Sequence, residues 1–445
     1  MQLSSVHLDS AIDYIYSYLT GRGADDVAVV GVRAVRWTLK IRRGSLASVE
    51  RSDTSFVRLM VGYKRRRACT LINALGEEAL KKQLQRLLSE AEKAPEDPYY
   101  APLPSGRVSY REPRGMYDGR ALDVTEAAET LKKLLGELAD VGIRRVSGTL
   151  ELVGIRRSVK TSGGRYGEYL KSVARLNLRC FDERGLSYPL GRASVSPRGL
   201  GLDDAPRTVR DMVAAARERV AVEPGRHDVI MAPLAAANLL GHCARLASAY
   251  YVDAGSSPFA EMLGRQVASP ELTLYDNPQE DNSPAAKPFD DEAVETRKTV
   301  VIDGGSLRTY LHNSRTALRH GIESTGHAGF VVPRPHSVFV TPNRGFEELL
   351  EELRQGLLIT NLWYLRFRSL RAGDFTAVTR DVVYAVSGGE VKGYAPGFRL
   401  SANVVALLRN VFGAGGVPET VSSWSTPYVS TVPHVGFRGV ALASL

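Results

Sequence analysis

Residues 227–278 read HDVIMAPLAAANLLGHCARLASAYYVDAGSSPFAEMLGRQVASPELTLYDNP, and they predict a strand, a helix, a loop and a second strand in succession. The first strand is the apolar run Val229 to Met231. Pro233 suits the first turn of a helix, and apolar residues recur at helical spacing from there to Tyr251, over about five turns. A Gly-Ser-Ser loop follows at 255–257, and the second strand ends in the acidic turn 276–278.

The predicted helix offers almost no side chain that could carry out chemistry. No Glu occurs between Glu223 and Glu261, and no Asp occurs between Asp228 and Asp253. Metal-dependent hydrolysis needs at least two ligand side chains on such a helix and a carboxylate that takes the proton of the water. The helix supplies one histidine, His242, and no carboxylate.

The cysteines and the helical histidine are predicted to be structural. His242 and Cys243 are adjacent on the helix and therefore point about 100° apart, so they cannot both bind one metal without distortion. We predict a packed or hydrogen-bonded His242 and a small, buried Cys243. Cys69 and Cys180 are the only other cysteines, which is too few for a disulfide framework or a cysteine zinc site.

Four further histidines follow one another in the second half of the chain. They are His312, His320, His327 and His336, spaced 8, 7 and 9 residues apart. No pair has the i, i+4 spacing by which two histidines on one helix share a metal, so we predict no metal site there. Ser256 and Ser257 lie in no G-x-S-x-G turn and have no identifiable base, and no phosphate-binding glycine loop occurs.

Length and composition are those of a globular protein with two or three domains. The chain has 445 residues, 44% of them hydrophobic and 24% charged. No apolar run approaches the roughly 20 residues that span a bilayer. Leu8, Ile12, Ile15 and Leu19 fall on one helical face, and no basic segment precedes them, so an exposed amphipathic helix and a cytoplasmic location are predicted.

The chain is basic, with 58 Lys and Arg against 49 Asp and Glu and a net charge of +9. Its densest basic run is Lys64 to Arg67, inside a strand-like segment. Arginine pairs occur beside other strand patterns, at Arg42-Arg43, Arg144-Arg145 and Arg156-Arg157. We interpret these residues as solvated sheet faces or protected sheet edges. Contact with nucleic acid or with an acidic partner surface stays open.

The first half of the chain alternates helices with runs of adjacent strands, which predicts an α+β fold. Residues 27–72 predict antiparallel strands, and Asn73 is the predicted cap of a helix containing Leu80 and Leu84. A proline-rich linker lies near 94–107. A second helix is predicted from Asp123, with Glu126 completing a capping box, to Gly142. Strands at 146–159 and 169–180 and a helix at 208–222 complete the predicted N-terminal domain, residues 1–223.

The second half, residues 224–445, is predicted as a strand-rich domain. Residues 281–298 are polar and acidic and predict a loop, and 330–341 predicts a strand broken by prolines. A short helix is expected at 347–355, a hairpin at Gly388-Gly389 and a last helix at 401–410. The tail, residues 418–445, predicts edge strands.

The segment GSSPFAEMLGRQVASPELTLYDNP resembles the core of the TldD/PmbA family of gyrase-modulator metalloproteases. Five more segments carry the resemblance in the family's order, from about Val27 to Ala443. They are LKIRRGSLASVERSD, PGRHDVIMAP, VIDGGSLRTYLHN with STGHAGF, EELLEELRQGLLIT and AGDFTAVTRDVVYAVSGGEVKGY. The resemblance implies a C-terminal domain of TldD/PmbA type and proteolysis of small or unfolded polypeptides. It also implies a heterodimer of a metal-bearing TldD-like subunit and a PmbA-like subunit.

In the metal-bearing branch of the family, the helix carries His-Glu followed four residues later by His or Asp, and a Cys near the carboxyl terminus is a further ligand. Here the helix lacks the motif and no Cys follows Cys243. The resemblance is therefore to the metal-less, PmbA/TldE-like branch. It implies no catalytic, metal or cofactor residue in this chain, and a metal, expected to be zinc, in a partner subunit.

These observations predict a non-catalytic subunit of a TldD/TldE-type metalloprotease complex, which helps to form a cavity and to hold an extended peptide. The predicted partner is a metal-bearing TldD-like homologue, with a homodimer left open, and neither nucleic acid nor membrane is the expected partner. Two alternatives remain. One is a stand-alone hydrolase with an unrecognised site, and the other is a nucleic-acid- or gyrase-associated binding protein.

Overall fold

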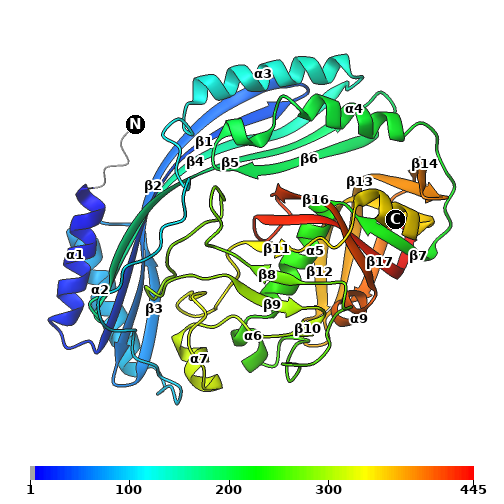
Figure 1. Cartoon of the computed structure of the whole chain (residues 1–445). Coiled ribbons are helices and arrows are strands. Elements are labelled where there is room, and N and C mark those ends of the chain that lie inside the picture. The colour runs from blue at the N-terminus through cyan, green and yellow to red at the C-terminus, as the bar shows by residue number, and fades with distance from the viewer. Residues whose placement is uncertain (1–5) are drawn as a thin grey trace.

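The computed structural model describes residues 6–445 and organises them around two β-sheets (Figure 1). A six-stranded antiparallel sheet, here called sheet A, arches over the C-terminal half of the chain. A mixed sheet of eleven strands, sheet B, forms that half. The predicted α+β class is confirmed. No helix within residues 6–445 is both long and apolar enough to cross a membrane.

Sheet A consists of long strands that pair along nearly their whole length, in the order β3-β2-β1-β4-β5-β6. The strands are β1 (Asp26–Arg42), β2 (Ser45–Tyr63), β3 (Arg66–Ile72), β4 (Arg145–Thr161), β5 (Tyr166–Phe181) and β6 (Ser187–Ser194). The antiparallel strands predicted for 27–72 are confirmed, and β6 lies in a segment for which no strand was predicted. The turn between β2 and β3 uses Lys64 and Arg65 at positive φ, as a tight type I′ hairpin requires.

Both faces of sheet A are covered by other parts of the chain. Successive side chains of a strand point to opposite faces, so neighbouring residues of one strand pack against different elements. Val27 and Val29 pack against the N-terminal helices. Ala28 and Val30, between and after them, pack against residues from the C-terminal half of the chain. The start of β1 therefore reads as a continuous apolar run rather than as an alternating one.

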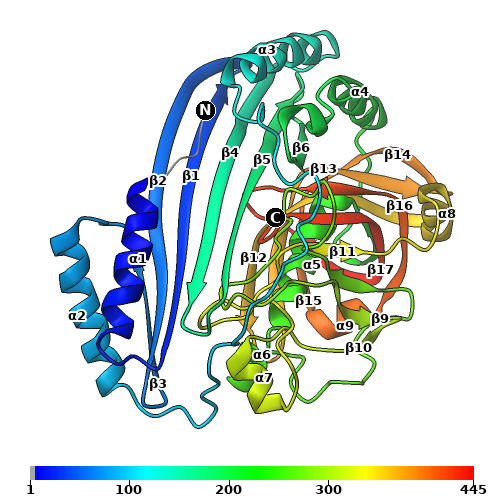
Figure 2. The same cartoon turned by 60° about the vertical axis from the view of Figure 1, so that its left-hand side comes forward.

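Four helices cover the convex face of sheet A (Figure 2). They are α1 (Val6–Thr20), α2 (Glu77–Lys93), α3 (Val124–Asp140) and α4 (Ala205–Ala215). The predicted cap at Asp123 is confirmed, since its carboxylate accepts hydrogen bonds from the backbone N–H groups of Thr125 and Glu126. The predicted cap at Asn73 is wrong, because α2 begins four residues later, after Gly76.

Sheet B is built on strands from the whole second half of the chain, in the order β10-β9-β8-β11-β17-β15-β13-β12-β7, with β14 and β16 attached. The strands are β7 (Gly225–Met231), β8 (Leu274–Asp276), β9 (Thr299–Asp303), β10 (Ser306–Leu307), β11 (Val338–Val340), β12 (Gln355–Ser369), β13 (Asp374–Ser387), β14 (Glu390–Ala395), β15 (Phe398–Asn403), β16 (Val411–Val421) and β17 (Ser430–Ser444). The hairpin predicted at Gly388-Gly389 joins β13 to β14.

Edge strands were predicted for the C-terminal tail, but its long strand β17 lies in the middle of sheet B. β17 pairs with β7, β11, β15 and β16. Its buried residues include Val432, Val435 and Phe437. The composition of the tail predicts strands, whereas the position of a strand within its sheet depends on pairing with residues 200 positions away, such as Met231 opposite Val435.

The helix predicted from Pro233 to Tyr251 is two helices, α5 (Pro233–Leu246) and α6 (Ala249–Asp253). The break falls at Ser248, which has an extended backbone. The backbone of Leu311 pairs with the chain on both sides of this break. Its carbonyl accepts a hydrogen bond from the N–H of Ala249, and its N–H donates one to the carbonyl of Ala247. The remaining helices are short: α7 (Ser314–His320), α8 (Phe346–Leu353) and α9 (Val404–Arg409), with a 3₁₀ turn at Pro197–Leu200.

Sheet A ends at Ser194 and sheet B begins at Gly225. One apolar cluster nevertheless joins them, containing Leu176 and Leu178 of sheet A and Ile230 and Leu358 of sheet B. The division into two domains at residue 223 therefore stays a prediction.

The segment 281–298, predicted to be a polar, acidic loop, is a loop, but its central part is buried. Asp290, Asp291 and Glu292 are each no more than 1% exposed. The loop crosses the concave face of sheet A, where Phe289 packs against Tyr169 with ring centroids 5.1 Å apart. Acidic residues usually indicate a surface, but a carboxylate can be buried when cations surround it.

The carboxylate of Asp291 is surrounded by cations in this way. It forms ion pairs with Arg157 of β4, with Arg58 of β2 at 2.5 Å, and with Arg334 at 3.8 Å. Burial alone would raise the pKa of Asp291, but Arg157 and Arg58 hold that pKa below its ordinary value. Arg157 is itself buried, so the interpretation of this arginine as a solvated sheet residue is wrong, whereas Arg42-Arg43 and Arg144-Arg145 are exposed.

Replacing Asp291 by Asn should destabilise the protein strongly, because it leaves the buried guanidinium of Arg157 without an anion. The expected loss is about 3–5 kcal/mol of unfolding free energy, measured from urea denaturation. Asp281→Asn is the matched control in the same segment. Asp281 pairs with the exposed Arg114, so its replacement should leave the urea midpoint nearly unchanged. Equal shifts in the two variants would contradict the assigned role of Asp291.

Candidate functional site

The helix α5 lies in the core, and its one histidine is a packed side chain. The His242 ring stands edge-on to Phe367, with centroids 5.8 Å apart. Within residues 6–445 its Nδ1 has no hydrogen-bond partner. Burial, followed by the charges of the nearby Arg245 and Arg366, lowers the pKa of His242 to about 4. The ring is therefore neutral at physiological pH.

The surroundings of α5 do not fit the metal that the metal-bearing branch carries. Cys243 is 2% exposed, and burial raises the pKa of its thiol to about 12, so no thiolate is available. Two guanidinium groups beside His242 would repel a cation. Within residues 6–445, no group of three or more His, Cys, Asp or Glu side chains has an arrangement that could hold a metal ion. The metal content of the protein itself stays a prediction.

The four histidines between residues 312 and 336 come together as two pairs. The rings of His312 and His320 lie 5.0 Å apart, and His320 Nε2 is 2.8 Å from a carboxylate oxygen of Asp253. Burial lowers the pKa of His312 to about 4, and His320 adds to this shift. The rings of His327 and His336 are stacked at 5.1 Å. Their sequence spacing gave no sign of these pairings, because the loops between them fold back.

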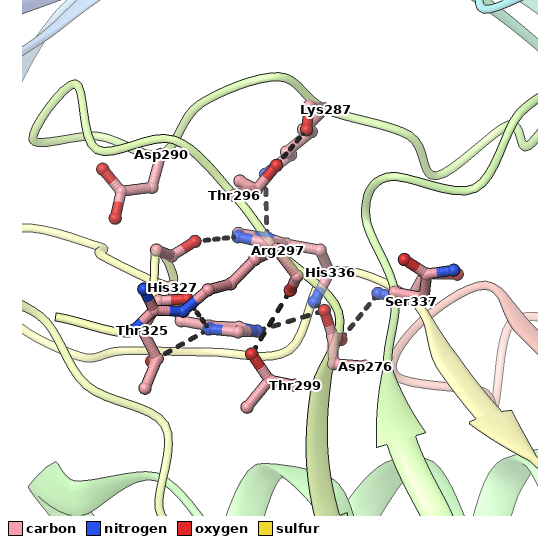
Figure 3. Close-up of polar contacts among 12 residues, drawn as sticks. Asp276, Lys287, Asp290, Thr296, Arg297, Thr299, Thr325, His327, His336 and Ser337 are labelled. Carbon is pink, nitrogen blue, oxygen red and sulfur yellow. Dashed lines mark hydrogen bonds and ion pairs between the residues drawn. The ribbon is translucent and has the colours of Figure 1, made fainter. Parts of the chain in front are cut away.

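The second pair belongs to a buried polar cluster around Asp276 (Figure 3). Asp276 ends β8 and is 1% exposed. It accepts hydrogen bonds from the backbone N–H groups of His336 at 2.7 Å and Ser337 at 2.8 Å, and its other oxygen lies 3.1 Å from His327 Nε2. His327 Nδ1 lies 2.9 Å from the carbonyl of Thr325. These bonds fix the loops of 324–337 against β8.

His336 connects this cluster to Lys287. His336 Nε2 lies 3.1 Å from the carbonyl oxygen of Gly326, which can only accept, so Nε2 carries the hydrogen. His336 Nδ1 therefore presents its lone pair to Lys287 Nζ, 3.2 Å away. Burial lowers the pKa of His336 well below its ordinary value, and Lys287 adds to this shift. The ring is a neutral acceptor for the lysine amine.

Three adjoining cavities lie between the concave face of sheet A and the loop 422–429 of the C-terminal half. Their volumes are about 30, 360 and 450 Å³. The first two share Ser423 and Trp424, and the last two share Tyr428. We call this series of adjoining cavities the groove. It runs along α5, from Leu234 at one end to Arg245 at the other.

The side of the groove that sheet A forms carries mostly basic side chains. Along β5, Ala174, Leu176 and Leu178 face the helices. Side chains on the other face of β5 line the groove, and they include Lys171, Arg175, Asn177 and Arg179. Arg179 pairs with Asp381 at 2.6 Å, and Arg175 lies 3.7 Å from Glu151.

An edge strand of sheet A borders the groove as well. β6 is the last strand of sheet A and pairs only with β5 in the described sheet. Its residues Pro189, Leu190 and Gly191 line the smallest cavity. An edge strand has unpaired backbone groups, which an extended peptide can use to add a strand.

The serines of the Gly-Ser-Ser loop have structural roles. Ser257 is 2% exposed, donates a hydrogen bond to the carbonyl of Leu246 at 2.7 Å and accepts one from the N–H of Phe259. Ser256 is partly exposed, and its hydroxyl makes a 3.4 Å contact with the carbonyl of Ala254. Neither hydroxyl lies near a base, so neither is arranged as a nucleophile.

Sequence reasoning did not single out Lys171, Lys287 or the loop 422–429. One signal was present, since Lys171, Arg175 and Arg179 alternate with apolar residues in a predicted strand. That pattern indicates one polar and one apolar face. The opposing loop gave no comparable signal, because its approach to β5 is a long-range contact.

Comparison with known proteins places these features in a family. Residues 224–441 match the family described as "PmbA/TldA metallopeptidase C-terminal domain". The chain is 24% identical to metalloprotease PmbA of Escherichia coli O157:H7 over 94% of this chain and 93% of that protein. It is 25% identical to a metalloprotease of Methanocaldococcus jannaschii, over 84% and 86% of the two chains.

Two solved structures share the fold. One is TldE from Thermococcus kodakarensis, with a TM-score of 0.83 and 20% identity over 99% of this chain and all of that chain. The other is a Thermotoga maritima protein named for a proposed role as a modulator of a DNA gyrase. Its TM-score is 0.85 at 22% identity, over 98% of this chain and all of that chain. With the six sequence segments and the two-sheet architecture, these matches show that the chain belongs to the TldD/PmbA family of metallopeptidase-like proteins.

Proposed function

We propose that this chain is the non-catalytic, TldE-like subunit of a cytoplasmic two-subunit metallopeptidase, and that it holds an extended peptide for a metal-bearing partner. The observation that carries the proposal is the composition of α5. The helix keeps its place beside the groove but offers a neutral His242 and a buried Cys243. A hydrolytic metal site needs three protein ligands and a base, which these residues do not provide.

The groove supports the peptide-holding part of the proposal. It is long, it runs beside the edge strand β6, and its cavities reach about 450 Å³. An extended peptide could pair with the edge through its main chain, which gives affinity without demanding one sequence. Trp424 and Tyr428 lie along the groove and offer apolar contact to side chains.

The partner proposed for this chain is a homologue whose helix carries the His-Glu motif and whose C-terminal part carries the ligand Cys. That subunit would hold the metal, expected to be zinc, and would supply the water that attacks the peptide bond. This chain would supply one wall of a closed cavity. A homodimer is the alternative assembly in the absence of such a partner.

Co-expression with a metal-bearing homologue from the same organism should yield one stable complex. Size-exclusion chromatography with mass measurement should give a single peak containing both chains at micromolar concentration. Stable interfaces of this kind bury about 1,200–2,000 Å² and survive such dilution. Separate peaks at every mixing ratio would contradict the proposed assembly.

The purified chain alone should contain no stoichiometric metal and should cleave no peptide. Elemental analysis and a peptide-cleavage assay measure both properties. His242→Ala is the control variant, and it should change neither result, because the ring is a packed side chain. One zinc per chain, with activity that a chelator abolishes, would contradict the proposal, and the segment containing His312, His320, His327 and His336 would then be the place to search for ligands.

A further inference from the structure

The middle cavity of the groove, about 360 Å³, has an unusual balance of charge. Its lining includes three basic side chains, Lys171, Arg175 and Lys287, and one acidic side chain, Glu151. Glu151 lies 3.7 Å from Arg175, so the single acid already has a partner. The two lysines come from different segments, one from β5 and the other from the segment 281–298.

Neither lysine has an acidic partner of its own. Within residues 6–445, neither amine lies within 4.0 Å of a carboxylate oxygen. Lys171 Nζ donates one hydrogen bond, to the carbonyl of Pro284 at 3.3 Å, and Lys287 Nζ donates one to His336 Nδ1 at 3.2 Å. An ammonium group can donate three hydrogen bonds, so both amines keep unused donors at the cavity.

The nearest buried acid cannot compensate for these charges. Asp291, four residues from Lys287, is already bound by Arg157, Arg58 and Arg334. A partly buried ammonium without an anion is unfavourable, and each amine responds by a lowered pKa. Burial, followed by the charges of Arg175 and Arg157, lowers the pKa of Lys171 to about 7. Burial also lowers the pKa of Lys287 well below its ordinary value.

We propose that this cavity binds a carboxylate group of a peptide that lies in the groove, with Lys171 and Lys287 as its two cationic contacts. The inference rests on the proposed peptide-holding function and adds a chemical preference to it. A carboxylate has two oxygens, so it can accept hydrogen bonds from both amines at once. Charge-assisted bonds of this kind are about twice as strong as neutral ones.

The walls of the cavity fit a peptide better than a free ion. Trp424, Pro427 and Tyr428 also line the cavity. These residues offer apolar contact to the carbon atoms that precede the carboxylate. Two sources of the group fit equally well: the C-terminal carboxylate of a peptide, and the side chain of an internal Glu or Asp.

Isothermal titration calorimetry of the purified chain with four matched peptides tests the proposal. Each peptide is N-acetylated, and the set combines a free or amidated C-terminus with an internal Glu or Gln. The peptide with no carboxylate should bind at least about tenfold more weakly than one that carries the favoured carboxylate, since each bond to a charged group is worth about 1.5–3 kcal/mol. The arm that restores affinity identifies whether the terminal or the side-chain carboxylate is bound.

The variants Lys171→Met and Lys287→Met remove the two cationic contacts while keeping most of the side-chain volume. Each should abolish the difference between the carboxylate and amide peptides. Neither should lower the melting temperature much, because each removes an amine that has no acidic partner. Lys133→Met is the control, since Lys133 lies exposed on α3 and outside the groove. It should retain the full preference.

Binding should also take up protons above neutral pH. The charged and titratable groups that face Lys171 and Lys287 are Glu151, Arg157, Arg175, Asp291, Arg334 and His336. An anion beside Lys171 raises its pKa, so a neutral amine must gain a proton when the peptide binds. Above pH 7 the affinity should therefore fall by up to about tenfold per pH unit, and the heat should depend on the ionisation enthalpy of the buffer. Lys171→Met should remove most of this dependence.

The outcomes separate this inference from the proposed function. Loss of the carboxylate preference in both lysine variants, with retention in Lys133→Met, supports the inference. Equal affinity for all four peptides, no binding of any of them at millimolar concentration, or a preference that survives both substitutions overturns it. The proposed function is tested by complex formation with the metal-bearing homologue, and it can stand when the carboxylate preference fails.

Discussion

The contact between Asp291 and its three arginines is the constraint on which the arrangement of the two sheets depends. A carboxylate in a nearly dry position is stable only as long as cations surround it. Two of those cations, Arg58 and Arg157, stand on the concave face of sheet A, while Asp291 belongs to the C-terminal half. The pairing therefore fixes the segment 281–298 across sheet A. Because Lys287 lies in the same segment, the pairing also determines where one side of the groove stands.

Much of the fold could be predicted from local sequence patterns. The helix containing Leu8 and Leu19, the cap at Asp123 and the hairpin at Gly388-Gly389 each depend on residues close together in the chain. The features that were missed depend on distant residues. Asp291 is buried against Arg157 and Arg58, each more than 130 residues away, and the terminal strand β17 is central because distant strands pair with both of its edges. Composition cannot show either arrangement.

The candidate site divides in the same way. The absence of ligand pairs on α5 could be read directly, because ligands on one helix must be close in sequence. The sequence contained part of the evidence for the basic side of the groove, because Lys171, Arg175 and Arg179 alternate with apolar residues in a predicted strand. What could not be predicted is that a second lysine, from another segment, lines the same cavity, together with one acid, Glu151. Lys287 looks in the sequence like an ordinary loop lysine, and only the fold gives it a neutral His336 as its hydrogen-bond partner.

The packing around α5 positions the loop that lines the groove. A Cβ atom placed on Gly241 would lie 2.8 Å from Pro427 Cγ, so the loop 422–429 rests directly on the helix at that position. A larger residue there would displace the loop, and the loop carries Trp424 and Tyr428, which line the groove. The groove wall therefore depends on a small residue and a close contact at this point of α5.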